Sequence, residues 1–97
     1  MWVIAVKTLK EFRQKHPDSE QPLKALYAEA RKANWKSSSD IKNLYRSTGI
    51  LKNNRVVFNI KGNSYRLVVA IKYKFQIVFI RFIGMHNEYD RIKAEEI

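Results

Sequence analysis

The sequence contains no cysteine, and its 97 residues include only three glycines and two prolines. Without a thiol the chain cannot form a disulfide framework, a thiolate zinc site or a cysteine nucleophile, so apolar packing alone must hold the core. No P-loop, Rossmann glycine pattern, serine elbow or zinc-binding motif occurs either. The chemistry of this protein must therefore rest on other residue types.

Long hydrophobic runs are also missing. The longest apolar stretch, Phe75–Ile83, has the length of a strand and contains Gln76 and Arg81, and the apolar start Met1–Val6 is followed at once by Lys7. Neither stretch fits a membrane-spanning helix, and Met1–Val6 does not fit a secretory signal. We therefore expect no membrane partner and a cytoplasmic location.

Acidic residues are few, and none lies between Ile41 and Asn87. Nineteen Lys and Arg against nine Asp and Glu give a formal net charge of +10, with the basic character concentrated in the second half. Such an imbalance favours polyanionic partners, with nucleic acid as the first candidate. The apolar share of 45% is too high for a disordered chain, so the charge decorates a packed body.

The length corresponds to a single domain over residues 1–97, and its N-terminal half has the pattern of a strand followed by helices. A short strand is expected in Trp2–Val6. Thr8 and Glu11 have the capping-box spacing, so a first helix is predicted to start at Thr8. A second helix is predicted over Glu20–Asn34, with Ser19 as its N-cap and an apolar stripe facing a core.

After a short helix around residues 41–45, the period of the sequence changes from helical to alternating. Arg55–Ile60, Tyr65–Tyr73 and Phe75–Ile83 are predicted to form three antiparallel strands joined by tight turns. The fold class is therefore α+β, with the N-terminal strand and helices packed on one face of an antiparallel sheet. The remaining large aromatics are expected to pack in the core or at its rim: Trp2, Tyr27 and Trp35.

The other face of this sheet is predicted to carry a polar set that suits a phosphate chain: Arg55, Asn59, Lys61, Arg66 and Lys72. His86 and Tyr89 follow the last strand directly. RNA cleavage without a metal needs a proton acceptor for the 2′-hydroxyl, fixed cations for the transition state and a proton donor for the 5′-oxygen. Arginine suits the second role, and His86 and Tyr89 can take the proton roles in either order.

A metal-dependent nuclease is disfavoured, because two-metal chemistry needs clustered carboxylates and the strands contain none. Glu88 and Asp90 are the only acids beside the basic stretch, and we interpret them as surface charges or as partners of an arginine. Each candidate also has an ordinary structural interpretation. A strand arginine can extend from a sheet edge, Tyr89 can be a core aromatic, and Asn59 can bond its sheet neighbours.

Three segments together resemble one family: VFNIKGNSYRLV at residues 57–68, VFIRFIG at 78–84 and HNEYD at 86–90. They are similar to the HigB-type toxins of bacterial type II toxin–antitoxin systems, within the RelE-like superfamily. The resemblance implies a RelE-like fold and an endoribonuclease that cuts mRNA in the ribosomal A site during translation. It implies neither a metal ion nor any other cofactor.

Transferred to this sequence, the resemblance implies four residues that bind the scissile phosphate or move protons: Arg66, Arg81, His86 and Tyr89. The residues expected to bind RNA beside them are Arg55, Asn59, Lys61, Asn63 and Lys72. The implied partners are mRNA, the ribosome and a HigA-like antitoxin with a helix-turn-helix domain, with operator DNA bound only through the toxin–antitoxin complex. A non-catalytic RNA- or ribosome-binding module and a protein-interaction domain are the alternatives.

Overall fold

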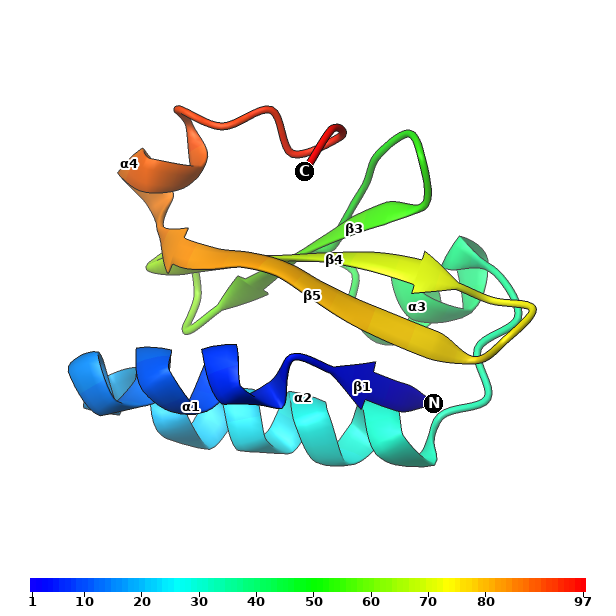
Figure 1. Cartoon of the computed structure of the whole chain (residues 1–97), viewed down its shortest axis with the longest axis horizontal. Coiled ribbons are helices and arrows are strands. Elements are labelled where there is room, and N and C mark those ends of the chain that lie inside the picture. The colour runs from blue at the N-terminus through cyan, green and yellow to red at the C-terminus, as the bar shows by residue number, and fades with distance from the viewer.

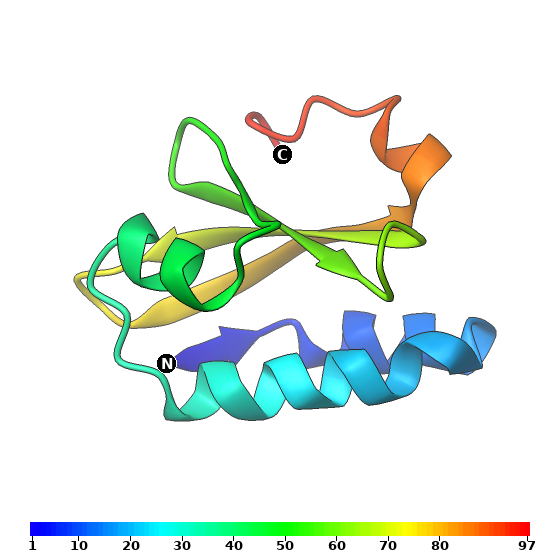
Figure 2. The same cartoon turned by 180° about the vertical axis from the view of Figure 1, so that it is seen from behind.

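The computed structural model describes all 97 residues, and it consists of one sheet with helices on one side and the C-terminal segment on the other (Figures 1 and 2). In chain order the elements are β1 (Trp2–Ile4), α1 (Val6–Lys15), the 3-10 helix η1 (Pro17–Ser19), α2 (Glu20–Lys32), α3 (Ser38–Leu44), β2 (Gly49–Ile50), β3 (Arg55–Ile60), β4 (Tyr65–Lys72), β5 (Ile77–Met85) and α4 (His86–Tyr89). The predicted α+β class, with helices on one face of the sheet, is confirmed.

The five strands lie in the order β1-β5-β4-β3-β2, so the first strand of the chain pairs with the last. β1 runs parallel to β5, whereas the other neighbours are antiparallel. A parallel pair cannot be joined by a hairpin, and here the connection contains the helices and the rest of the meander. None of the helices combines the length and the apolarity that crossing a bilayer requires.

The sheet separates two clusters of apolar side chains. On the inner face, alternate residues of β3 and β4 pack against α1 and α2, and Val56 stands opposite Val69 in the centre of this larger core. On the outer face, Val57 stands opposite Val68, and the C-terminal segment covers both through Ala94. Because strand side chains alternate between faces, the same two strands contribute to both clusters.

A β-bulge interrupts the pairing of β4 with β5. Val69 pairs with Ile80 and Val68 with Phe82, which leaves Arg81 as the extra residue. Such an insertion bends the strand and increases its twist. The sequence analysis treated this strand as uninterrupted and did not predict the bulge.

Helix starts differ from the predicted capping patterns. α1 begins at Val6, two residues before Thr8, because Ala5 adopts a left-handed conformation with φ 75° and its carbonyl accepts the N–H of Thr8 at 3.0 Å. Ser19 is fully buried, and its hydroxyl donates to the carbonyl of His16 at 2.7 Å instead of capping α2. Both predicted side-chain caps are therefore wrong.

Two further elements were not predicted. The two-residue strand β2 extends the sheet beyond β3, and α4 forms where only a polar segment was expected. Of the two tryptophans, Trp35 is buried as expected, whereas Trp2 is 66% exposed. Trp2 therefore lies outside the core.

Candidate functional site

The candidate site lies at one end of the outer face of the sheet. Asn59, Arg66 and Gly84 form a row across β3, β4 and β5, because Asn59 pairs with Arg66 and Arg66 pairs with Gly84. α4 starts two residues after Gly84, at the same end, where the N–H of His86 donates to the carbonyl of Ser64. Figure 1 shows α4 on the outer side, above the end of β5.

The guanidinium of Arg66 donates hydrogen bonds to backbone carbonyls and forms no ion pair with a carboxylate. One Nη donates to the carbonyl of Asn63 at 3.1 Å and approaches that of Tyr65 at 3.4 Å. None of the ion pairs in the structure includes Arg66. The guanidinium is therefore oriented by the β3–β4 turn and keeps N–H donors for an anion.

His86 is held by the carboxylate of Asp90, the residue that directly follows α4. Its Nδ1 lies 3.0 Å from Oδ2 of Asp90, and both side chains are more than half exposed. With Nδ1–H donating to Asp90, Nε2 is the ring nitrogen left for a substrate. Glu88 has a different role, because its Oε1 accepts the N–H of Met85 at 2.8 Å and caps α4.

Tyr89 is half-buried and packs against the small outer cluster that includes Val57, Val68 and Phe82. Arg81 is exposed at the bulge, three residues before Gly84, which is roughly 10 Å along the strand. Tyr89 and the α4 segment thus lie on the same side of the sheet as Arg66.

The predicted RNA-binding residues are more dispersed. Nε and Nη2 of Arg55 donate to the backbone oxygen of Ile97. The C-terminal segment therefore already uses two of the donor nitrogens of this guanidinium. The amide of Asn59 donates to the carbonyl of Ser47 at 2.9 Å, so its partner is the loop between α3 and β2 and not a neighbouring strand. Lys72 is exposed at the far end of β4, six residues from Arg66 or roughly 20 Å.

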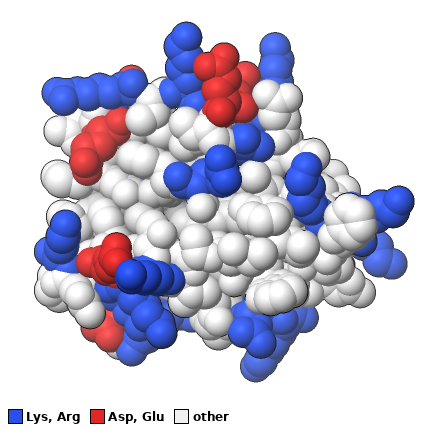
Figure 3. All heavy atoms as spheres, viewed as in Figure 1, with Lys and Arg blue, Asp and Glu red and all other residues white.

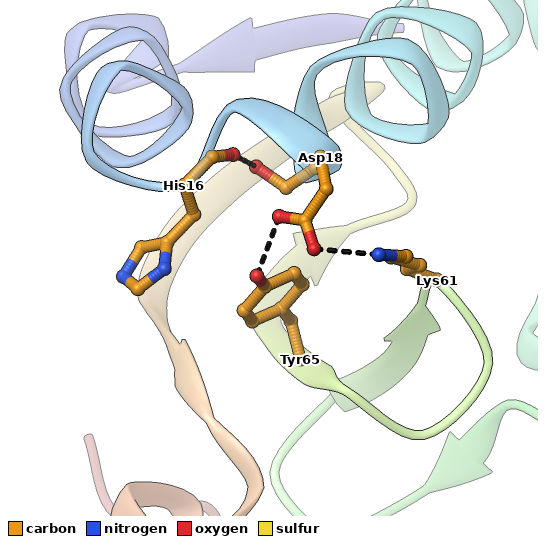
Figure 4. A network of polar contacts seen from close by, with 5 residues as sticks. His16, Asp18, Lys61 and Tyr65 are labelled. Carbon is orange, nitrogen blue, oxygen red and sulfur yellow. Dashed lines mark hydrogen bonds and ion pairs between the residues drawn. The ribbon is translucent and has the colours of Figure 1, made fainter.

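Lys61 does not lie on the outer face, and its predicted place there is wrong. Its Nζ pairs with Oδ2 of Asp18 at 2.6 Å, on the side of the helices, and the hydroxyl of Tyr65 donates to Oδ1 of the same carboxylate at 2.6 Å (Figure 4). Lys61 has a left-handed backbone with φ 51°. The alternation of side chains therefore ends at Ile60 and does not extend to Lys61, as the sequence analysis had assumed. Asn63 lies in the exposed turn between these two residues.

Asp18 therefore ties both ends of the β3–β4 turn to the helical layer. Its hydrogen bonds with Lys61 and Tyr65 hold the pKa of the carboxyl below its ordinary value, and the same contact raises the pKa of Tyr65. The ring of His16 stacks on Phe12 at 4.4 Å between centroids and lies 5.2 Å from that of Tyr65. This network lies on the face of the sheet opposite to the candidate site.

Replacing Asp18 by Asn is expected to destabilise the protein at neutral pH. Because the folded state lowers the pKa of Asp18 below 3.8, the ionised carboxylate stabilises the fold above that pH, and this contribution is lost as the pH falls through the lowered value. Urea denaturation of both proteins across this range should show a difference that shrinks in acid. Glu11→Gln, which removes a loose 3.8 Å pair with Lys7, is the control and should change little.

No group of three or more His, Asp or Glu side chains in the structure is arranged to hold a metal ion. The groups that the site does offer are guanidinium cations, an imidazole with a carboxylate partner and a phenol. These can bind a phosphate and move protons beside it.

Comparison with known proteins identifies the family of the chain. Residues 19–92 match the model of the HigB toxin family, described as the RelE-like toxic component of a toxin–antitoxin system. The mRNA interferase toxin HigB of Escherichia coli K12 is 32% identical over 97% of this chain and 92% of its own length, and mRNA interferase HigB of Shigella flexneri gives the same values. An mRNA interferase HigB of Escherichia coli O6:H1 is 22% identical over 95% of this chain. The chain belongs to the HigB family of RelE-like toxins.

Two contacts were missed from the sequence, one within the candidate site and one on the opposite face of the sheet. The spacing of His86 and Asp90, four residues apart, is the signal that could have paired them once a helix was predicted there. The contact of Asp18 with Lys61 joins residues far apart in the chain and has no comparable signal.

Proposed function

We propose that this protein cleaves messenger RNA on the translating ribosome, with its own side chains as the only catalytic groups. Its relatives are named mRNA interferases, and as a member of their family the chain is an endoribonuclease of this type. One observation carries the proposal for the site: an unpaired guanidinium, that of Arg66, lies at the same end of the same sheet face as the helix with His86 and Tyr89.

Arg66 binds the scissile phosphate and stabilises the charge of the five-coordinate transition state. Its planar fork can donate two hydrogen bonds to phosphate oxygens, and its alignment by the carbonyl of Asn63 lowers the cost of ordering it. Arg81 supplies a second cation from the bulge of β5. Lys72 and Asn63 contact the RNA further along the face and at the turn.

His86 and Tyr89 carry the two proton transfers. The 2′-oxygen attacks phosphorus as one of these groups removes its proton, the bond from phosphorus to the 5′-oxygen breaks, and the other group protonates that oxygen. The products are a 2′,3′-cyclic phosphate and a free 5′-hydroxyl. Asp90 holds the ring of His86, and this fixes which nitrogen faces the RNA.

As the toxic component of a toxin–antitoxin system, the protein has an antitoxin partner. We infer a HigA-like partner with a helix-turn-helix domain, and operator DNA is contacted through that partner within the complex. The site of action is the cytoplasm, where messages are translated.

Mapping of message ends in a translating extract tests this function. We expect the protein to introduce ends within codons of translated transcripts, and to leave a transcript intact when its initiation is blocked. A message with a 2′-deoxynucleotide at one mapped position should resist cleavage there, because the attacking hydroxyl is missing.

Each arm of this experiment can contradict one part of the proposal. Equal cutting of the blocked transcript would exclude the requirement for translation. Cleavage at the deoxynucleotide, with 5′-phosphate ends, would exclude the side-chain mechanism and favour metal-type hydrolysis. A message that stays intact throughout would indicate the non-catalytic RNA-binding alternative.

A further inference from the structure

Two large aromatic side chains are exposed at the corner of the molecule far from α4. Trp2 and Phe75 are 66% and 67% exposed. The N–H of Trp2 donates to the carbonyl of Gln76 at 2.8 Å, so β1 and the β4–β5 turn bring both residues to one place. In Figure 1 the N-terminus and this turn lie at the same end of the sheet.

The backbone at this corner is held in place. Gln76 has a left-handed φ of 58°, and its side-chain amide donates to the carbonyl of Trp35 at 2.7 Å and to that of Tyr73 at 2.9 Å. These bonds fix the turn that carries Phe75. Trp2 precedes the buried Val3 and pairs with Ile77, so alternation places its indole on the outer face of the sheet. Exposed apolar residues that occur singly are ordinary, but two aromatic rings at one fixed corner form a surface without a partner.

The charge around the two rings is positive. Lys72 is exposed at the end of β4 and alternates onto the same face as Arg66, and the Nζ of Lys74 lies 5.9 Å from the centroid of the Phe75 ring. Residues 41–87 contain no acid. The acid near this turn is Asp40, which accepts the N–H of Lys36. Burial, and after it the charge of Asp40, raises the pKa of Tyr73. Figure 3 shows basic but no acidic side chains at this end of the displayed face.

We propose that Trp2 and Phe75 form a stacking platform for single-stranded message RNA, with its phosphates held by Lys72 and Lys74. Aromatic rings interleaved with cations are the usual means of binding single strands, and the positive charge beside the two rings suits a chain of phosphates. Lys72 lies roughly 20 Å from Arg66 on the same face, so the platform holds nucleotides at a distance from the cleaved bond. This inference rests on the proposed function, because that function places the RNA on this face.

Intrinsic fluorescence gives a direct test, because Trp2 is exposed and Trp35 is only 5% exposed. The probe is a short single-stranded oligoribonucleotide. It is added to the Arg66→Ala variant, which should leave it uncleaved. We expect quenching of Trp2. Phe75→Ala and Trp2→Ala should each weaken binding, measured by anisotropy of a labelled probe, by roughly 5-fold to 100-fold. Trp2→Phe retains a ring and should recover most of the affinity.

Leu44→Ala is the matched control, since this α3 residue is 63% exposed and lies outside the corner. The absence of quenching, or an equal loss of affinity in Leu44→Ala, would overturn the platform. So would quenching by ribosomes that carry no message, which would assign the surface to ribosomal RNA, or quenching by the antitoxin alone. None of these results affects cleavage of translated transcripts by the wild type, so the proposed function is judged separately.

Discussion

Arg66→Ala is expected to lower the rate of mRNA cleavage by roughly 100-fold to 1,000-fold, which is the usual cost of removing one preorganised donor from a charged transition state. Arg66 lies on the outer face in a row with Asn59 and Gly84, and its guanidinium is paired with no acid. Its loss therefore leaves the transition state less stabilised and breaks no ion pair of the fold. Single-turnover cleavage of a translated transcript measures the effect.

Two variants serve as references for this experiment. Arg66→Lys should retain part of the activity, because lysine keeps the charge but lacks the bidentate fork. Arg46→Ala removes an exposed arginine after α3 and should cleave like the wild type. Full activity in Arg66→Ala, with an unchanged circular dichroism spectrum, would show that this guanidinium takes no part in catalysis.

Gly84→Ala is expected to destabilise the protein by about 1–3 kcal/mol, the usual cost of forcing an extra methyl group into a packed site. A Cβ at this position would lie 2.6 Å from the ring of Phe82 and 3.2 Å from Oε1 of Glu88. The ring belongs to the outer cluster with Tyr89, and the carboxylate caps α4. The substitution should therefore displace α4 and also reduce cleavage by the protein that remains folded.

Urea denaturation of Gly84→Ala gives the change in the free energy of unfolding, and cleavage is measured well below the transition. Gly49→Ala is the matched control, because its Cβ would meet Val57 at 3.7 Å, an ordinary contact. A stable Gly84→Ala protein with wild-type cleavage would mean that α4 can shift without cost, contrary to the role proposed for it.

Two strands of the meander, β3 and β4, were predicted well because their signal is local, whereas β5 lies two residues later than predicted at each end. The bounds of β3 agree with the structure at both ends, and β4 differs by one residue at its C-terminal end. Alternation of apolar and polar residues fixes the face of each side chain, and Val56 and Val57 accordingly belong to different clusters. These features follow from neighbouring residues and need no knowledge of the rest of the chain.

The features that were not predicted depend on distant contacts or on unusual backbone conformations. Ala5, Lys61 and Gln76 are left-handed without being glycine, and they shift the start of α1, the side on which Lys61 lies and the start of β5. Their sequence gives little sign of this, because ordinary residues rarely adopt positive φ. The bulge at Arg81 likewise arises from pairing with β4.

For the candidate site, alternation placed Arg66 on the outer face, and the sequence placed His86 and Tyr89 in the segment that follows the last strand. The structure adds that Tyr89 packs on this same outer face. Arg55 and Lys61 were expected to be available to RNA. Instead, Arg55 donates to the backbone oxygen of Ile97, and Lys61 forms an ion pair with Asp18. Their contacts join segments 42 and 43 residues apart, and no local pattern reports them.

The pairing of β1 with β5 also affects how this toxin is made. β1 precedes the other strands in the chain, and its only partner in the sheet is β5, which follows all of them. β1 therefore stays unpaired until β5 has been synthesised, and the α4 segment follows β5. Folding of the N-terminal helices alone thus cannot complete the sheet or bring α4 beside it.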